Sequence, residues 1–183
     1  MAKRALIIVD LQNDYFQGGK WTLDGIEPAA ENAAKLIARF REAGEPVVHI
    51  RHEFPADGAP FFAAGSEGAK IHDKVIPIEG EPVVLKHNVN SFLETNLKQI
   101  LDDNKIEDLV ICGAMSHMCI DATARAASDF GYKCTLIHDA CATRAQEFNG
   151  MEVPAEQVHA TYMASLGFAY AKVISTDEFT AGK

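Results

Sequence analysis

Three residues whose side chains can do nucleophilic chemistry lie at or just beyond the ends of apolar, strand-like runs. They are a carboxylate, an ammonium and a thiol: Asp10, Lys86 and Cys119. A thiol near a helix N-terminus and a cation ionises more easily, and a nearby carboxylate can take up its proton. If the fold brings the three together, they predict nucleophilic catalysis by the thiol.

Each of the three residues alone also fits an ordinary structural role. Cys119 fits a small buried side chain on a helix face, and Asp10 fits a cap after a strand. Lys86 fits a solvated residue at a strand end. Spacing by itself therefore leaves both interpretations open.

Apolar runs alternate with helix-period segments along the whole chain. The predicted strands are 5–9, 46–50, 82–85, 108–112, 134–137 and 172–174. The predicted helices are 28–43, 96–104, 118–130 and 154–165, with Gly44, Gly131 and Gly167 as expected helix ends. This alternation predicts a three-layer α/β/α fold with a mostly parallel, Rossmann-like sheet. Ligands of such sheets bind beyond the carboxyl ends of the strands, where the three residues fall.

Composition bounds the class of protein. A chain of 183 residues fits one domain, 1–183. Its apolar runs are too short to cross a bilayer, and its N-terminus lacks a secretory signal pattern, so a cytoplasmic protein is expected. A net charge of -9 without a Lys/Arg run argues against nucleic acid. The expected partner is a small-molecule substrate, with neither nucleic acid nor membrane.

The cysteines lack the paired spacing of a redox or zinc motif. All are expected to be free thiols: Cys112, Cys119, Cys134 and Cys141. Cys112 and Cys134 fall in apolar runs and are interpreted as inert core thiols. Cys141 follows a predicted strand end and is given no role.

Three segments resemble the hallmark motifs of the isochorismatase-like cysteine hydrolases, in the family's order: 5–16, 86–92 and 111–123. The similarity in order and spacing covers nearly the whole chain. It implies that Cys119 is the nucleophile, Asp10 the base that takes its proton, and Lys86 the cation that tunes both. It further implies a cis peptide bond between Ala114 and Met115. The N–H groups of Met115 and Cys119 would then form the oxyanion hole.

The reaction that this resemblance implies is hydrolysis of a C–N bond in an amide or cyclic amide. Sulfur attacks the carbonyl to leave a thioester on Cys119, and water activated by Asp10 releases the acid. The string 116–121 is similar to that of members acting on cyclic amides, including streptothricin hydrolases. Relatives are commonly dimers or tetramers, so a homodimer or homotetramer is expected.

Two alternative functions stay open. One is isochorismatase-type cleavage of a vinyl ether, which need not use Cys119. The other is a redox module in which Cys119 is oxidised reversibly, without an amide substrate.

The second predicted strand ends differently from that of metal-dependent nicotinamidases in the family, which carry Asp-x-His there. This chain reads Ile50-Arg51-His52-Glu53. Glu53, Asp57 and His72 are candidates to join His52 around an ion, but their spacing matches no metal motif. No metal and no cofactor are therefore expected, and His52 is interpreted as an exposed loop histidine.

The stretch from His52 to Pro77 is too long for an ordinary connection and is predicted to cover the site. Aromatic residues in it or near the first motif are predicted to contact substrate: Tyr15, Phe16, Trp21 and Phe54. His117, two residues before Cys119, is predicted to line the pocket. His117 has two alternative interpretations. It could act as a base that forms a dyad with Cys119, or it could be a solvated or capping histidine.

Overall fold

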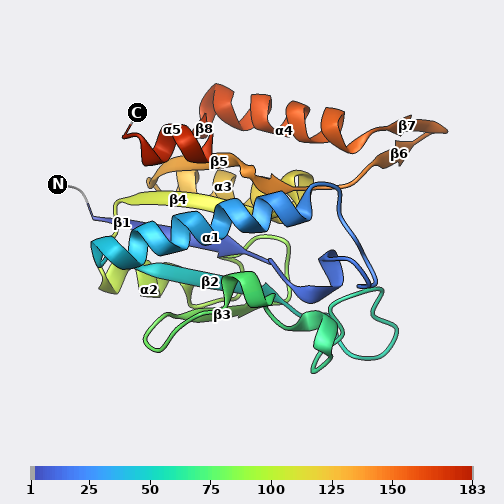
Figure 1. The fold of residues 1–183 in the computed structure, drawn as a ribbon, viewed down its shortest axis with the longest axis horizontal. Coiled ribbons are helices and arrows are strands. Elements are labelled where there is room, and N and C mark those ends of the chain that lie inside the picture. The colour runs from blue at the N-terminus through green and yellow to red at the C-terminus, as the bar shows by residue number, and fades with distance from the viewer. Residues whose placement is uncertain (1–2, 183) are drawn as a thin grey trace.

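The computed structural model describes residues 3–182, and its centre is a sheet of six parallel strands in the order β3-β2-β1-β4-β5-β8 (Figure 1). The strands are β1 (Arg4–Val9), β2 (Val47–His52), β3 (Val83–Lys86), β4 (Asp108–Ala114), β5 (Lys133–Ala142) and β8 (Ala171–Ile174). Strands β1 and β4 are buried almost throughout, because helices cover both faces of the sheet.

Helices lie on both faces of the sheet, which confirms the predicted three-layer fold. On one face α1 (Ile26–Ala43) packs beside α5 (Thr176–Thr180) (Figure 1). On the other lie α2 (Leu97–Asp103) and α3 (Asp121–Asp129), with α4 (Ala155–Ala169) next to α3. Helix α1 buries a stripe from Ile26 to Phe40 at helical spacing and ends at Gly44 in the left-handed conformation.

Three features differ from the sequence-based predictions. Gly167 does not end a helix, because α4 continues to Ala169. Cys141 lies inside β5 rather than after a strand. The third feature is a two-stranded hairpin, β6 (Gln146–Phe148) and β7 (Met151–Val153). Its turn, Asn149-Gly150, has positive φ at both residues, which favours Asn-Gly.

The order of the strands creates a switch point between β1 and β4. From β1 the chain adds β2 and β3 on one side, and it then crosses back to add β4 on the other side of β1. The carboxyl ends of the strands point toward the side where segment 53–77 and the β6–β7 hairpin lie (Figure 1). Open parallel sheets bind ligands at this edge.

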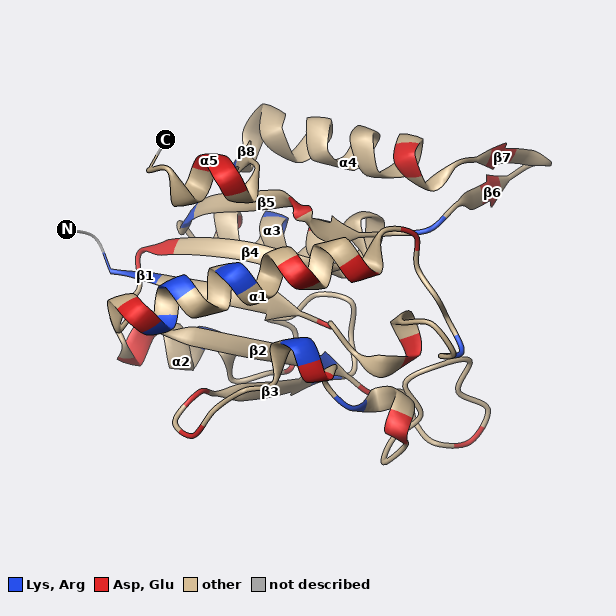
Figure 2. Ribbon diagram, viewed as in Figure 1, with Lys and Arg blue, Asp and Glu red and all other residues tan. Residues whose placement is uncertain are grey.

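Figure 2 shows acidic and basic residues interspersed along the elements. This arrangement agrees with the net charge of -9. Between residues 3 and 182, no helix has both the length and the apolar character needed to cross a membrane.

Candidate functional site

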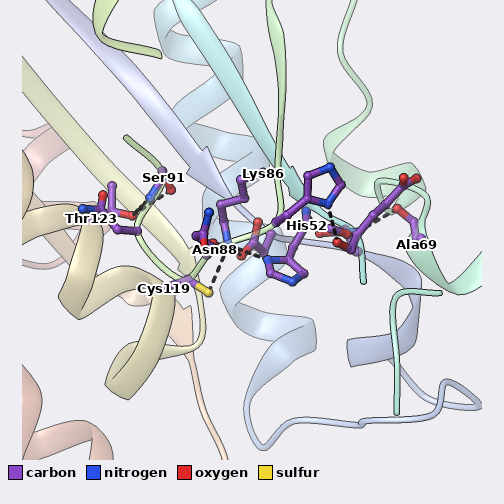
Figure 3. A network of polar contacts seen from close by, with 12 residues as sticks. His52, Ala69, Lys86, Asn88, Ser91, Cys119 and Thr123 are labelled. Carbon is purple, nitrogen blue, oxygen red and sulfur yellow. Dashed lines mark hydrogen bonds and ion pairs between the residues drawn. The ribbon is translucent and has the colours of Figure 1, made fainter. Parts of the chain in front are cut away.

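The fold brings Asp10, Lys86 and Cys119 together at the switch point. Figure 3 shows Lys86 beside Cys119. Asp10 directly follows β1, Lys86 is the last residue of β3, and Cys119 lies in the helical turn Ser116–Ile120 after β4. The Lys86 Nζ lies 2.7 Å from Asp10 Oδ2 and 3.2 Å from Cys119 Sγ. Asp10 and Lys86 are 0% exposed and Cys119 is 6% exposed, so the three groups interact away from bulk water.

The backbone around these residues adopts three uncommon conformations. Asp10 has a φ of 51°, in the left-handed region that aspartate tolerates better than most residues. Gly113 near the end of β4 passes so close to β1 that a Cβ there would lie 2.0 Å from the Val9 carbonyl oxygen. Only glycine fits at that crossing. The peptide bond between Ala114 and Met115 is cis.

The Lys86 ammonium has four neighbours for its three hydrogens. Besides Asp10 and Cys119, it lies 3.1 Å from His52 Nδ1 and 3.1 Å from the Asn88 carbonyl oxygen (Figure 3). Burial by itself would lower the pKa of Lys86, but the charges of Asp10 and Cys119 and the hydrogen bonds to them outweigh burial and raise it. The side chain therefore stays a cation at neutral pH.

The Cys119 thiol is harder to ionise than the sequence-based prediction assumed. Burial and, next, the Asp10 carboxylate raise its pKa to about 12, although Lys86 acts in the opposite direction. Burial also raises the pKa of Asp10, against the lowering effect of Lys86. The resting thiol is therefore protonated, beside a carboxylate that is a stronger base than in water.

His52 is not an exposed loop residue, so that prediction is wrong. It is the last residue of β2, it is 5% exposed, and in the parallel register it sits directly opposite Lys86. The neighbouring strand buries it. Among the residues that the structure describes, no three His, Cys, Asp or Glu side chains gather as a metal site would need. His72, another of the residues considered as metal ligands, stacks on Phe16 with 3.5 Å between ring centroids.

Two buried polar residues that were not predicted to belong to the site hold segment 53–77 in place. The Gln12 amide donates to the carbonyl oxygens of His52 (2.8 Å) and Ala69 (2.7 Å). The Asp14 carboxylate accepts a hydrogen bond of 2.7 Å from the Phe62 N–H. The sequence feature that could have identified Gln12 and Asp14 is their position as polar residues shortly after the buried strand β1.

A cavity of about 670 Å³ lies beside the segment that holds Cys119, although Asp10, Lys86 and Cys119 themselves are not among its lining residues. Trp21, Phe54 and Phe61 form an aromatic wall, and Met115, His117 and Met118 come from the segment that holds Cys119. The β6–β7 hairpin contributes Glu147 and Glu152, after Arg144 in the preceding loop. Segment 53–77 thus supplies part of the wall.

The cavity wall contains some of the predicted substrate contacts and not others. Trp21, Phe54 and His117 line it, and His117 Nδ1 lies 2.6 Å from the Thr143 hydroxyl. Tyr15 and Phe16 do not line it, and both are buried in the core. Burial and the nearby Cys119 and Asp10 raise the pKa of Tyr15, which stays protonated beside the cluster.

Comparison with known proteins identifies the family. The model of the isochorismatase domain matches residues 4–178. The chain is 47% identical over 175 residues to the isochorismatase family protein YddQ of Bacillus subtilis, covering 96% of this chain and 97% of YddQ. A crystal structure from Oleispira antarctica, assigned to the isochorismatase hydrolases, superimposes with a TM-score of 0.96 at 60% identity, covering 98% of this chain and 97% of that one.

Two more distant relatives are named for a reaction. The chain is 36% identical over 142 residues to a streptothricin hydrolase of Streptomyces noursei, covering 76% of this chain and 50% of that protein. It is 31% identical over 156 residues to the maleamate amidohydrolase of Pseudomonas putida, covering 78% and 73%. This chain therefore belongs to the isochorismatase family and is a hydrolase of that family.

Proposed function

We propose that this protein hydrolyses a C–N bond of a small amide or cyclic amide through a thioester on Cys119. The observation that carries the proposal is the buried contact of one ammonium with both a carboxylate and a thiol. Lys86 Nζ lies 2.7 Å from Asp10 and 3.2 Å from Cys119. A nucleophile, a base and a cation within contact distance are the parts that nucleophilic acyl transfer needs.

In the first half-reaction the Cys119 sulfur attacks the carbonyl carbon while its proton passes to the Asp10 carboxylate. The raised pKa of Asp10 favours this transfer. Protonated Asp10 then gives the proton to the nitrogen as the C–N bond breaks. The backbone N–H groups of Met115 and Cys119 are the proposed donors to the oxyanion. An amine or ammonia leaves, and the acyl group stays on sulfur.

In the second half-reaction Asp10 takes a proton from water as the oxygen attacks the thioester carbonyl. The C–S bond breaks, the sulfur recovers a proton from Asp10, and the carboxylic acid leaves. Lys86 keeps its charge throughout and offsets the negative charge that moves between its two partners.

The cavity supports a substrate with an apolar, flat acyl part. Three of its lining residues are Trp21, Phe54 and Phe61, whose rings pack against one another. The names of the maleamate and streptothricin enzymes support hydrolysis of small molecules, and the former names an amide.

The two alternatives fit the site less well. A redox sensor needs an accessible thiol of low pKa, whereas Cys119 is 6% exposed and its pKa is raised to about 12. Cleavage of a vinyl ether does not need a thiol, so the contact between Lys86 and Cys119 would have no role in that reaction.

The test is a panel of small primary amides and lactams, assayed for product acid and released ammonia or amine. Wild type is compared with Cys119→Ala and with Cys141→Ala, a buried thiol in β5 that serves as the matched control. Turnover should fall by about 1000-fold or more in Cys119→Ala and stay close to wild type in the control. Acid formation at the wild-type rate in Cys119→Ala would exclude the thioester.

A further inference from the structure

His52 makes a contact with Lys86 that fixes which nitrogen of its ring carries a proton. Its Nδ1 lies 3.1 Å from Lys86 Nζ, and an ammonium can only donate. Nδ1 must therefore present a lone pair, and the proton of the neutral ring sits on Nε2.

The surroundings of His52 disfavour its charged form. The ring is 5% exposed, Nε2 has no hydrogen-bond partner within residues 3–182, and the Phe54 ring lies 4.3 Å away between centroids. The nearby charged or titratable groups, Lys86 and His87, both disfavour a second positive charge, and the Asn88 backbone, which favours it, has a smaller effect than Lys86. Burial, followed by Lys86, lowers the pKa of His52 to about 4. His52 is thus a neutral acceptor at neutral pH.

The backbone of His52 is held on both sides. The Gln12 side chain accepts from the His52 N–H at 2.7 Å and donates to the His52 carbonyl oxygen at 2.8 Å. Gln12 is fully buried, and β2 pairs His52 with Lys86 in register. The acceptor therefore has a fixed place relative to the end of β3.

The Lys86 ammonium has four neighbours. Asp10 and Cys119 exchange a proton during the proposed reaction, and the other two neighbours do not. Negative charge moves between Asp10 and Cys119, so attraction alone would pull the ammonium toward whichever is ionised. His52 Nδ1 and the Asn88 carbonyl oxygen stay neutral acceptors, both at 3.1 Å. They can hold the ammonium in one place while its charged partners change.

Building on the proposed function, we propose that His52 is a positioning residue that keeps the Lys86 ammonium between Asp10 and Cys119 through the lone pair of Nδ1. The residue that plays this role is the last residue of β2.

Paired variants test this role. His52→Asn places an amide oxygen near the former Nδ1, whereas His52→Leu keeps side-chain volume and removes the acceptor. His52→Leu should lower kcat by about 100-fold with little change in KM, because an ammonium displaced by about 1 Å no longer serves both partners. His52→Asn should recover most of the loss. His138→Leu, in β5 and outside the cavity lining, is the matched control and should keep wild-type turnover.

A substrate-free measurement separates this role from the proposed function. In long-range ¹⁵N–¹H spectra of histidine-labelled protein, the His52 signals are identified by their loss in His52→Asn. They should show the Nε2–H tautomer between about pH 5 and 8. An imidazolium or an Nδ1–H tautomer at neutral pH, or His52→Leu turning over as fast as wild type, would overturn the role of His52. Wild type that hydrolyses no amide would instead overturn the proposed function.

Discussion

Replacing Lys86 with methionine should destabilise the protein far more than removal of a surface lysine. Asp10 and Lys86 are both 0% exposed, and their charged atoms lie 2.7 Å apart. Methionine keeps much of the stem's packing but leaves the Asp10 charge buried without its counter-ion. Breaking a buried ion pair in this way costs about 3–5 kcal/mol of unfolding free energy.

The cost of Lys86→Met should depend on pH in a defined direction. In wild type Lys86 opposes the effect of burial on Asp10, so without Lys86 the pKa of Asp10 rises further. A carboxyl group whose pKa is higher in the folded than in the unfolded state contributes its full stabilisation of the fold below its unfolded pKa. That contribution is lost as pH rises through its folded pKa. The variant should therefore lose stability, relative to wild type, as the pH is raised from acid toward neutral.

Urea unfolding at several pH values measures this effect. The matched control is Lys98→Met, whose partner Asp102 is an exposed neighbour on α2; the two side chains are 46% and 50% exposed. Its loss should be below about 1 kcal/mol. Adding Asp10→Asn to Lys86→Met removes the uncompensated charge and should restore much of the stability. A Lys86→Met loss equal to that of the control, or one independent of pH, would refute a charged buried pair.

Three further outcomes follow from the site and its surroundings. Asp10→Asn should reduce kcat by about 100-fold or more, and a near-normal rate would transfer the role of base to another group such as His117. Activity should survive prolonged treatment with strong chelators, whereas a loss restored by one divalent ion would reveal a required metal. Burial opposes ionisation of Glu81, yet Arg41, a backbone N–H and His49 lower its pKa to about 2. Wild type should therefore be more stable than Glu81→Gln by its full margin above about pH 4.5, and this margin should vanish as the pH falls through about 2. Urea unfolding at several pH values measures the margin. A margin that does not change with pH would contradict the prediction.

The fold and the meeting of the three central residues were predictable from the pattern of strands, whereas the roles of these residues were indicated only by the resemblance to the family's motifs. Strands buried on both faces appear as continuous apolar runs, and parallel strands bring their carboxyl ends to one edge. Asp10 and Lys86 lie at such ends. The β6–β7 hairpin also had a signal, in Asn149-Gly150, but its strands of three residues are too short for a clear alternation.

The state of the thiol and the place of His52 were not predictable in this way. The pKa of Cys119 depends on how deeply the fold buries the sulfur, and spacing along the chain does not report depth. His52 looks like a loop residue because its buried neighbour, Lys86, lies 34 positions away and meets it through the register of β2 and β3. Tertiary packing between segments far apart in the sequence decided both.

Acyl transfer to Cys119 can be measured directly by mass spectrometry. Wild type is mixed with the para-nitroanilide of an acid identified in the amide panel, because a good leaving group favours accumulation of the acyl-enzyme. After acid quenching, the acyl mass should be found on the peptide that contains Cys119, should disappear with hydroxylamine, and should be absent from Cys119→Ala. Release of nitroaniline by wild type with the acyl group on another residue, or with Cys119→Ala equally active, would contradict the thioester mechanism.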